Sequence, residues 1–283
     1  GRLGVKIDLK KFNQISEKVP VLVNLKPSGT NYMEDFYYGG AMKAFLKEVS
    51  PFLKKGTTTI EGKLLSKVIK ENAKSFHDTN IIRTRKKPFE PKGGLVSLFG
   101  NICPNGAILK RSAADKSLFE TTGKAFVFDD IKEMARLVDS PKLKISKNDI
   151  LVLKNIGPKT SYGMPEAGYL PIPKKLLRKG VKDMIRISDG RMSGTAFGTI
   201  ILHVSPESAV KGPFAAVQTG DKIKLSVKNK SLNLLISNAE LEKRLKKIKS
   251  KEPKISRGYL KLYYDTVTQA DEGCDFDFLK YKK

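Results

Sequence analysis

The chain has 283 residues, and its 54 Lys and Arg against 29 Asp and Glu give it a net charge of +25. Hydrophobic residues make up 40% of the sequence, which is enough for one large or two modest cores and excludes a mostly disordered protein. Because no stretch approaches about 18 consecutive apolar residues, we expect no transmembrane helix and no membrane partner. Two cysteines exclude a disulfide scaffold and indicate a reducing, cytoplasmic location, and they are too few to ligate an iron–sulfur cluster or a structural zinc ion.

The excess of basic residues first suggests a nucleic-acid-binding protein. Only 10 of the 54 basic residues are Arg, however, and Arg is the side chain that contacts guanine and phosphate in a bidentate manner. In the densest basic run, residues 241–251, the apolar residues Leu241, Leu245 and Ile248 recur at helical spacing. We therefore predict a surface helix with a solvated lysine face, with RNA or DNA binding as the weaker alternative.

The first 87 residues alternate between strand-like and helix-like segments. Val19–Leu25 is a Val-rich apolar run that predicts a buried strand, a helix is expected over about 33–49, and a shorter strand and helix over 57–75. This order is typical of an open α/β domain, but such a domain needs more strands than these. We predict that residues 1–87 are the C-terminal part of an incomplete α/β domain.

A stretch rich in Pro, Gly, Arg and Lys between residues 80 and 94 predicts a domain boundary, so that residues 88–283 form a second domain. Beyond it, eight short strands alternate with turn residues, which predicts a closed or partly closed barrel with flanking helices. The strands are expected at Leu95–Phe99, Gly106–Leu109, Ala125–Phe128, Ile150–Lys154, Asp183–Ile187, Thr199–Val204, Lys222–Val227 and Ser231–Leu235. Short helices are expected near 131–138 and 174–178, and a further one is expected to begin at Ser205, with Pro206 at its first helical position.

Two glycine-rich loops each follow a predicted strand directly. The first spans residues 155–166, and the second spans residues 188–198 with glycines at 190, 194 and 198. Glycines let the backbone approach a ligand, and consecutive N–H groups can bind a carboxylate or a phosphate. Neither loop has the glycine spacing of a nucleotide-binding motif, so an acid-binding site and ordinary barrel turns are the two interpretations.

Glu166 and Ser193 are the candidate reactive residues of these loops. A carboxylate at the end of a strand is a hard oxygen ligand suited to Mg²⁺, and a serine held among glycines can act as a nucleophile or a base. A solvated glutamate and a turn-forming serine are the simpler interpretations. We expect His203 to be a structural residue of its strand, Cys103 to be a buried thiol, and the acidic C-terminal segment to be a solvated tail.

Several short motifs in a fixed order connect the chain with a known family. They are Pro20–Gly29, Tyr32–Phe36, Asn105–Lys110, Ala125–Asp130, Gly163–Glu166, Asp189–Gly194, His203–Glu207 and Arg257–Leu260. In these motifs the chain resembles the C-terminal half of the dihydroxy-acid dehydratase / 6-phosphogluconate dehydratase family. The resemblance implies an α/β fold in which the tail of an open α/β domain precedes a β-barrel-like, swivelling β/β/α domain.

Further segments resemble the sugar-acid branch of the family, of the arabinonate and xylonate type, more than the enzyme of branched-chain amino-acid biosynthesis. They are Leu170–Leu177, Arg191–Thr195, Leu202-His203 and Gln269–Leu279. The implied activity is that of a hydro-lyase, a carbon–oxygen lyase that dehydrates a polyhydroxy acid to a 2-keto-3-deoxy acid. The dihydroxy-acid dehydratase of branched-chain biosynthesis is one alternative, and a non-catalytic module that binds an acid or a partner is the alternative of another class.

The resemblance also implies cofactors and site residues. An iron–sulfur cluster, with the 2Fe–2S type favoured, and Mg²⁺ are the implied cofactors, while Glu166 matches the Mg²⁺ ligand and Ser193 the catalytic base. Cys103 and Cys274 match none of the cluster cysteines, which are expected in an N-terminal half preceding Gly1. Substrate binding is implied for Gly190, Gly194 and Thr195.

The same resemblance implies that the chain is part of a longer protein and that it has partners. We expect the chain to be a fragment of a protein about twice as long, with little or no turnover by itself. The expected partners are the small acid substrate, the missing half, and further copies of the protein in a dimer or tetramer. The charge of +25 is then expected on a lysine-rich surface around a site that binds acids.

Overall fold

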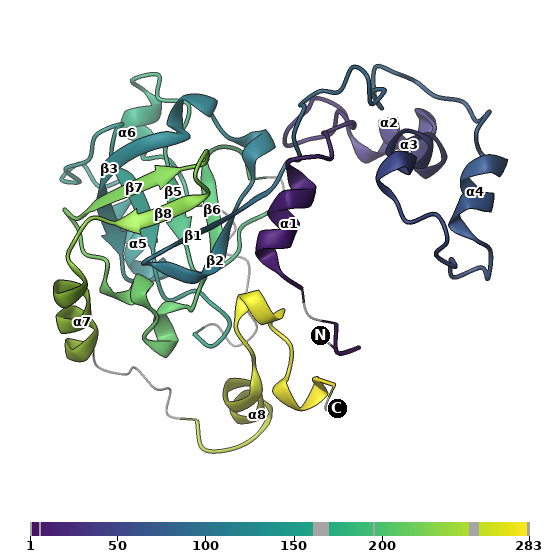
Figure 1. Ribbon diagram of the computed structural model, residues 1–283. Helices are drawn as coiled ribbons and strands as arrows, with labels where there is room; N and C mark the ends of the chain where they lie inside the picture. The colour runs from purple at the N-terminus through teal and green to yellow at the C-terminus, as the bar shows by residue number, and fades with distance from the viewer. Residues whose placement is uncertain (1, 6, 161–169, 195, 249–254, 282–283) are drawn as a thin grey trace. The chain divides into compact units, whose positions relative to one another are not determined.

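The structure is a computed structural model that describes residues 2–5, 7–160, 170–194, 196–248 and 255–281. By their internal contacts, the residues form two compact units. The smaller unit is Asn13–Gly94, and the larger is Leu95–Lys283 together with the N-terminal segment Gly1–Phe12 (Figure 1). Helix α1, Leu9–Ser16, begins in the larger unit and ends in the smaller.

The smaller unit consists of short helices joined by irregular segments. The helices are α2 (Met33–Tyr38), α3 (Ala41–Val49), the 3-10 helix η1 (Ser50–Phe52) and α4 (Leu65–Glu71). The strand predicted over residues 19–25 is wrong. Val21 and Val23 make only isolated bridges, to Glu90 and Ile82, because each partner segment runs alongside for a single residue.

The helix predicted over residues 33–49 is interrupted at Gly39 and Gly40. Gly40 has a φ of 113°, in the left-handed region that favours glycine. A Cβ atom at this position would lie 2.3 Å from the carbonyl oxygen of Phe76, so only glycine fits. The single helix predicted from the sequence is therefore two helices, with a turn at Gly39 and Gly40 that the hydrophobic spacing did not indicate.

The larger unit is built on a closed eight-stranded barrel, which confirms the predicted architecture (Figure 1). Around the barrel the strands follow the order β1-β2-β6-β5-β4-β3-β7-β8. The four neighbours β3, β4, β5 and β6 run parallel to one another, and β1 also runs parallel to β8. The strands are β1 (Val96–Gly100), β2 (Cys103–Leu109), β3 (Glu120–Phe128), β4 (Ile150–Leu153), β5 (Arg186–Ser188), β6 (Ile200–Ser205), β7 (Lys222–Ser226) and β8 (Ser231–Leu234).

Two clusters of buried side chains form the core of this unit. The first fills the barrel and includes Leu98, Val152 and Ile223, each fully buried. The second covers the outside of β4 and includes Leu151 and Leu153. Because all four residues of β4 are buried, this strand is apolar on both faces, as expected for a parallel strand covered on both sides.

The flanking helices largely occur where the sequence predicts them. They are α5 (Ile131–Leu137), α6 (Lys174–Leu177) and α7 (Asn238–Lys247), and α7 buries Leu241 while its charged residues stay exposed or half-buried. The helix predicted to begin at Ser205 is wrong in its start. Ser205 is still paired with Gly106 of β2, so β6 extends through it, and the short 3-10 helix η4 begins only at Ser208.

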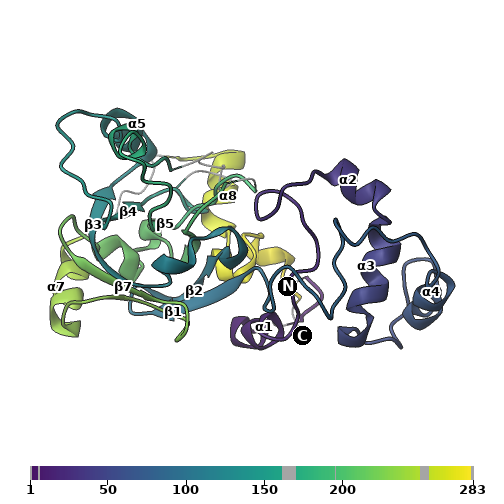
Figure 2. The ribbon, with the colours of Figure 1, turned by 90° about the horizontal axis from the view of Figure 1, so that it is seen from above.

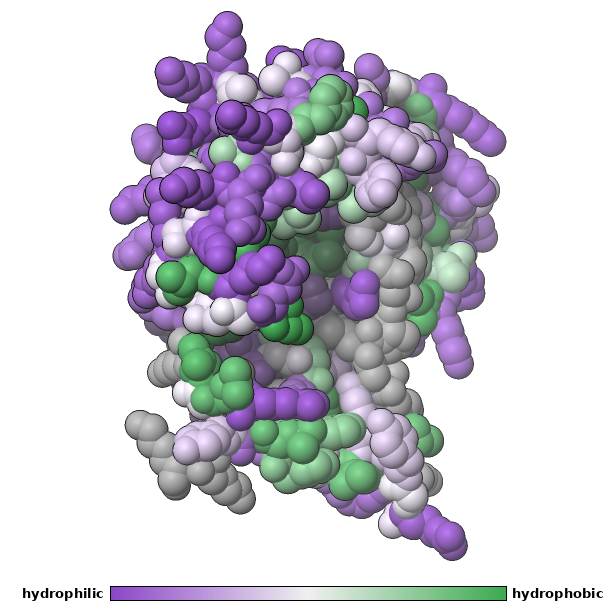
Figure 3. All heavy atoms as spheres, turned by 90° about the vertical axis from the view of Figure 1, so that its right-hand side faces the viewer, coloured by the Kyte–Doolittle hydropathy of each residue, from purple (hydrophilic) through white to green (hydrophobic). Residues whose placement is uncertain are grey.

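Short helical turns complete the larger unit. They are η2 (Arg111–Ala113), η3 (Lys116–Leu118), η4 (Ser208–Val210), η5 (Pro213–Ala216), α8 (Tyr259–Thr266), η6 (Ala270–Glu272) and η7 (Asp277–Leu279). Lys154 and Arg186 are the buried basic side chains of the described residues. Figure 3 shows hydrophilic side chains gathered over the upper part of one face, with hydrophobic side chains between them and in its lower part. None of the helices in the described residues is long and apolar enough to span a membrane.

Candidate active site at the ends of strands β4 and β5

The two glycine-rich loops begin at neighbouring positions of the barrel. Strands β4 and β5 are neighbours in the barrel (Figure 2), and Leu153, the last residue of β4, is paired with Ser188, the last residue of β5. Because β4 and β5 are parallel, the loops that follow them leave the same end of the barrel, where α/β folds commonly bind ligands. The structure therefore brings together the starts of the two loops that the sequence singled out.

The predicted site residues fall partly within the described chain. Ser193, Gly190 and Gly194 lie in the loop after β5, with Ser193 half-buried and Gly194 exposed. Glu166 and Thr195 lie outside the described residues. The described parts of the two loops are held in place by hydrogen bonds to side chains of the barrel and of the loops themselves.

Asp189 ties the start of one loop to the start of the other. Its fully buried carboxylate accepts hydrogen bonds from the backbone N–H groups of Asn155 (3.2 Å), Ile156 (3.1 Å) and Ser208 (2.9 Å). Burial raises the pKa of this carboxyl group, and the three N–H donors oppose that rise by stabilising the anion. Sequence reasoning missed this residue, although an acidic residue directly after an apolar strand is a visible signal.

Glu207 is a second buried carboxylate beside the first loop. It accepts hydrogen bonds from the backbone N–H of Lys159 at 3.0 Å and from Nε2 of Gln269 at 2.8 Å. The backbone N–H of Glu207 in turn donates to Oε1 of Gln269 at 2.8 Å. Burial raises the pKa of Glu207, and the nearby charge of Asp189 raises it further. These bonds anchor the first loop to the C-terminal segment that follows α8.

Glycine at two positions allows this close packing of the loops. A Cβ atom on Gly190 would lie 2.4 Å from Cγ1 of Ile156, and one on Gly157 would lie 2.4 Å from Oε2 of Glu207. A Cβ atom on Gly194 would meet none of the described residues within 4 Å. Gly190 therefore serves the contact between the loops, while no described residue packs against Gly194 where a side chain would be.

The turn that carries Ser193 is held from outside the loop. The backbone N–H of Ala196 donates to the carbonyl oxygen of Ser193 at 2.9 Å, which closes the turn. Nζ of Lys110 donates to the carbonyl oxygens of Gly194 (2.6 Å) and Ala196 (3.5 Å). Burial lowers the pKa of Lys110. Sequence reasoning quoted Lys110 only as part of a family motif and gave it no role.

Arg186 holds the far ends of both loops. Its guanidinium donates to the carbonyl oxygen of Leu170 at 3.2 Å, a few residues after the first loop, and to that of Phe197 at 2.8 Å, near the end of the second. Asp183 lies 3.0 Å from the same guanidinium and balances its charge. Arg186 is 1% exposed, so its bonds are made out of contact with water. Sequence reasoning missed Arg186, although a charged residue inside a predicted strand could have indicated its buried role.

The described residues do not bring together the ligands of an iron–sulfur cluster. Cys103 is buried in the barrel core, where burial raises the pKa of its thiol to about 12, and its Sγ faces the carbonyl oxygens of Leu98 and Leu232. Cys274 lies in the C-terminal segment between η6 and η7, away from that core. In the described part of the chain, no three His, Cys, Asp or Glu residues are arranged to hold a metal ion.

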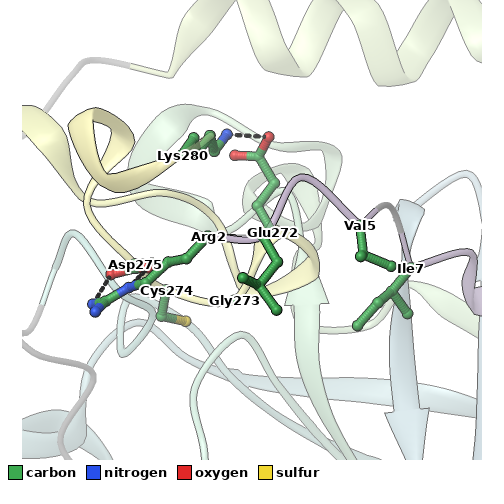
Figure 4. Close-up of a pocket in the computed structure, with 9 residues that line it drawn as sticks. Arg2, Val5, Ile7, Glu272, Gly273, Cys274, Asp275 and Lys280 are labelled. Carbon is green, nitrogen blue, oxygen red and sulfur yellow. Dashed lines mark hydrogen bonds and ion pairs between the residues drawn. The ribbon is translucent and has the colours of Figure 1, made fainter. Parts of the chain in front are cut away.

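A cavity of about 860 Å³ lies beside β2 and β6, within the larger unit. His203 lines it together with residues of the N-terminal and C-terminal segments, and the backbone N–H of His203 donates to the carbonyl oxygen of Gly190 at 3.1 Å. Burial, and then the charge of Arg191, lower the pKa of the imidazole. A neighbouring pocket contains two ion pairs, Arg2 with Asp275 and Lys280 with Glu272 (Figure 4).

The larger unit is a closed barrel that carries two joined glycine-rich loops at one end, and comparison with known families identifies the family of the chain. Residues 80–274 match the family described as dihydroxy-acid/6-phosphogluconate dehydratase C-terminal, and residues 1–68 match the corresponding N-terminal family. The chain belongs to the dihydroxy-acid/6-phosphogluconate dehydratase family.

Named relatives of the chain include both sugar-acid dehydratases and dihydroxy-acid dehydratases. It is 42% identical to a 6-deoxy-6-sulfo-D-gluconate dehydratase of Pseudomonas putida over 282 residues and 42% identical to an L-arabonate dehydratase of Azospirillum brasilense over 288 residues. It is 38% identical to a dihydroxy-acid dehydratase of Dehalococcoides mccartyi (strain CBDB1) over 275 residues. These matches cover 99%, 99% and 96% of this chain but 48%, 49% and 48% of the relatives, so the chain spans about half the length of the relatives that it matches.

Proposed function

We propose that the chain is the C-terminal half of a hydro-lyase that converts a sugar acid to a 2-keto-3-deoxy acid. The observation that carries this proposal is the Asp189 carboxylate, which joins the loop of Ser193 to the loop leading to Glu166 at the ends of two parallel strands. The higher identity to the sulfogluconate and arabonate dehydratases than to the dihydroxy-acid dehydratase supports a sugar acid over a branched-chain precursor.

In this proposal Ser193 removes the proton from C2 of the substrate. A serine hydroxyl in water is a weak base, and it needs nearby positive charge to ionise. When bound, Mg²⁺ and a 2Fe–2S cluster supply such charge and assist the departure of the C3 hydroxyl group. Glu166 is the Mg²⁺ ligand that this chain contributes, and the cluster cysteines and remaining ligands belong to the other half of the protein.

The open space beside Ser193 suits the binding of a polyhydroxy acid. Gly194 is exposed and carries no side chain that would fill this space. We assign Gly194, together with Thr195, to the binding of the substrate, and Gly190, which packs against Ile156, to holding the loop in place. The proposed working form contains both halves of the protein and assembles as a homodimer or homotetramer.

The experiment expresses the chain together with its upstream coding sequence and loads it with iron, sulfide and Mg²⁺. The release of 2-keto acid is measured with L-arabinonate, D-xylonate, 6-deoxy-6-sulfogluconate and 2,3-dihydroxyisovalerate. We expect turnover of a sugar acid to exceed that of 2,3-dihydroxyisovalerate. A loaded protein that releases no keto acid from any of the four would contradict the proposed activity.

The role of Ser193 is tested in the same protein by Ser193→Ala. We expect this variant to lose turnover while its far-UV circular dichroism and melting temperature match those of the parent. Ser66→Ala, at an exposed position of α4, is the matched control and should keep full activity. Full activity of Ser193→Ala would show that another group removes the proton.

A further inference from the structure

Lys110 connects strand β2 to the turn that carries Ser193. It follows Leu109, the last residue of β2, and Leu109 is paired with Ile201 of β6. The loop of Ser193 returns to the barrel at β6, so Lys110 leaves β2 next to the returning end of the loop. From there its Nζ atom reaches the carbonyl oxygens of Gly194 at 2.6 Å and Ala196 at 3.5 Å.

The two carbonyl groups that Lys110 binds belong to the turn that Ser193 begins. Ala196 donates its backbone N–H to the carbonyl oxygen of Ser193, and Lys110 binds the carbonyl oxygen of Ala196 itself. Gly194 is the residue directly after Ser193. Two bonds from one ammonium group to two peptide units of a single turn fix its orientation more firmly than either bond alone, because rotation about one is blocked by the other.

The charge of Lys110 has no counter-ion in the described part of the chain. No carboxylate there lies within ion-pair distance of its Nζ atom, and the residue is half-buried. Lys154 provides the contrast: it also donates to two carbonyl groups, but its Nζ atom lies 2.9 Å from the carboxylate of Asp129. Among the described residues, the positive charge of Lys110 is thus directed at the turn of Ser193 and is not paired with a carboxylate.

We propose that Lys110 is a positioning residue for Ser193, holding its turn through two carbonyl groups and favouring the ionised serine hydroxyl through its ammonium charge. This inference rests on the proposed role of Ser193 as the base. Lys110 acts through the loop and does not contact the reacting atoms in this proposal. A variant without the charge should therefore slow the chemical step more than it weakens substrate binding.

The experiment compares Lys110→Met, Lys110→Gln and Lys110→Arg in the full protein loaded with its cofactors. We expect Lys110→Met to lower kcat on the order of 100-fold with KM changed by less than about 3-fold, which is the size expected for the loss of one oriented charge. Lys110→Arg should have a kcat at least about 10-fold higher than that of Lys110→Met, because arginine keeps the positive charge and the N–H donors. Lys110→Gln, which keeps a donor without the charge, should stay closer to Lys110→Met.

Lys175→Met is the matched control for a general loss of packing. Lys175 is also half-buried and also donates to a backbone carbonyl oxygen, that of Leu143, away from both loops. We expect this variant to keep the parental kcat. If Lys110→Met does not fold, kcat is compared between Lys110→Gln and Lys110→Arg instead. We then expect kcat of Lys110→Arg to be at least about 10-fold higher, and equal values would overturn the inference.

Hydrogen exchange gives a readout that does not depend on turnover. The amide of Ala196 is protected by its bond to Ser193, and we expect Lys110→Met to speed its exchange by about 10-fold while Lys175→Met leaves it unchanged. Parental kcat in Lys110→Met, in a protein that Ser193→Ala inactivates, would overturn this inference alone. An active Ser193→Ala variant would overturn the assignment of Ser193 and this inference with it.

Discussion

The carboxylate of Asp189 accepts the backbone N–H of Ile156 at 3.1 Å, across the ends of two neighbouring parallel strands. This single contact joins the first residues of the Ser193 loop to the first residues of the loop that leads to Glu166. Two further N–H donors, from Asn155 and Ser208, converge on the same carboxylate. The relative placement of the loops is therefore set at the barrel end, before either loop reaches its candidate reactive residue.

Asp189→Ala is expected to destabilise the protein by about 3 kcal/mol, because it leaves buried backbone donors without an acceptor. Asp189→Asn should destabilise it less, since the amide keeps one acceptor oxygen. The measurement is urea unfolding followed by far-UV circular dichroism. Asp115→Asn is the control, because Asp115 is exposed and accepts the backbone N–H of Ser117 at 2.9 Å, and it should change the free energy of unfolding by less than about 0.5 kcal/mol. An equal loss in the two Asn variants would contradict a special role for Asp189.

The glycines of the second loop should separate stability from activity. In Gly190→Ala the new Cβ atom meets Ile156 at 2.4 Å, so we expect a loss of about 1–3 kcal/mol in the free energy of unfolding. Gly194→Ala places its Cβ atom in open space and should keep the parental stability. Because that space is the proposed substrate site, Gly194→Ala should raise KM. Unchanged stability in Gly190→Ala would show that the contact between the loops is loose.

The barrel could be predicted from the sequence, whereas most of the network around the site could not. Each strand is a short apolar run bounded by turn residues, which is a local signal, and all eight strands were predicted. The contacts of Lys110, Asp189 and Glu207 instead join residues far apart in the sequence, such as Lys110 and Gly194, and no local pattern indicates such pairs. The strand predicted at residues 19–25 failed for a related reason, since an apolar run forms a strand only where a partner runs beside it.

Glu207 should give the stability of the protein a measurable pH dependence. Burial raises its pKa above the usual value of 4.5, so between 4.5 and the raised pKa the folded state binds more protons than the unfolded state. The free energy of unfolding must then fall as the pH rises through this window. Glu207→Gln removes the titrating group, so its stability should fall less between pH 4.5 and the raised pKa. The measurement is the melting temperature in steps of pH.

Glu120 offers a control of opposite sign for this experiment. The backbone N–H of Lys228 donates to its carboxylate and lowers its pKa, so its contribution to stability is lost as the pH falls through that lowered value. This loss lies below pH 4.5, so Glu120→Gln should reduce the change of stability with pH there and leave the decline above pH 4.5 unchanged, where Glu207→Gln makes that decline shallower. The same slope in both variants would rule out Glu207 as the source of the pH dependence.

The two cysteines should be dispensable for the cofactor if the cluster ligands belong to the other half of the protein. Cys103 is buried in the barrel core, and burial raises its pKa to about 12, so its thiol should react with alkylating reagents only when the barrel unfolds. Cys274 is half-buried and should react sooner. Cys103→Ala and Cys274→Ala are expected to bind the same amount of iron per chain as the parent when the full protein is loaded.

Because Cys103→Ala removes a buried sulfur atom, it should also lower the free energy of unfolding by about 1 kcal/mol, which separates a packing role from ligation. A loss of iron in either variant, with the fold retained, would place a cluster ligand in this chain.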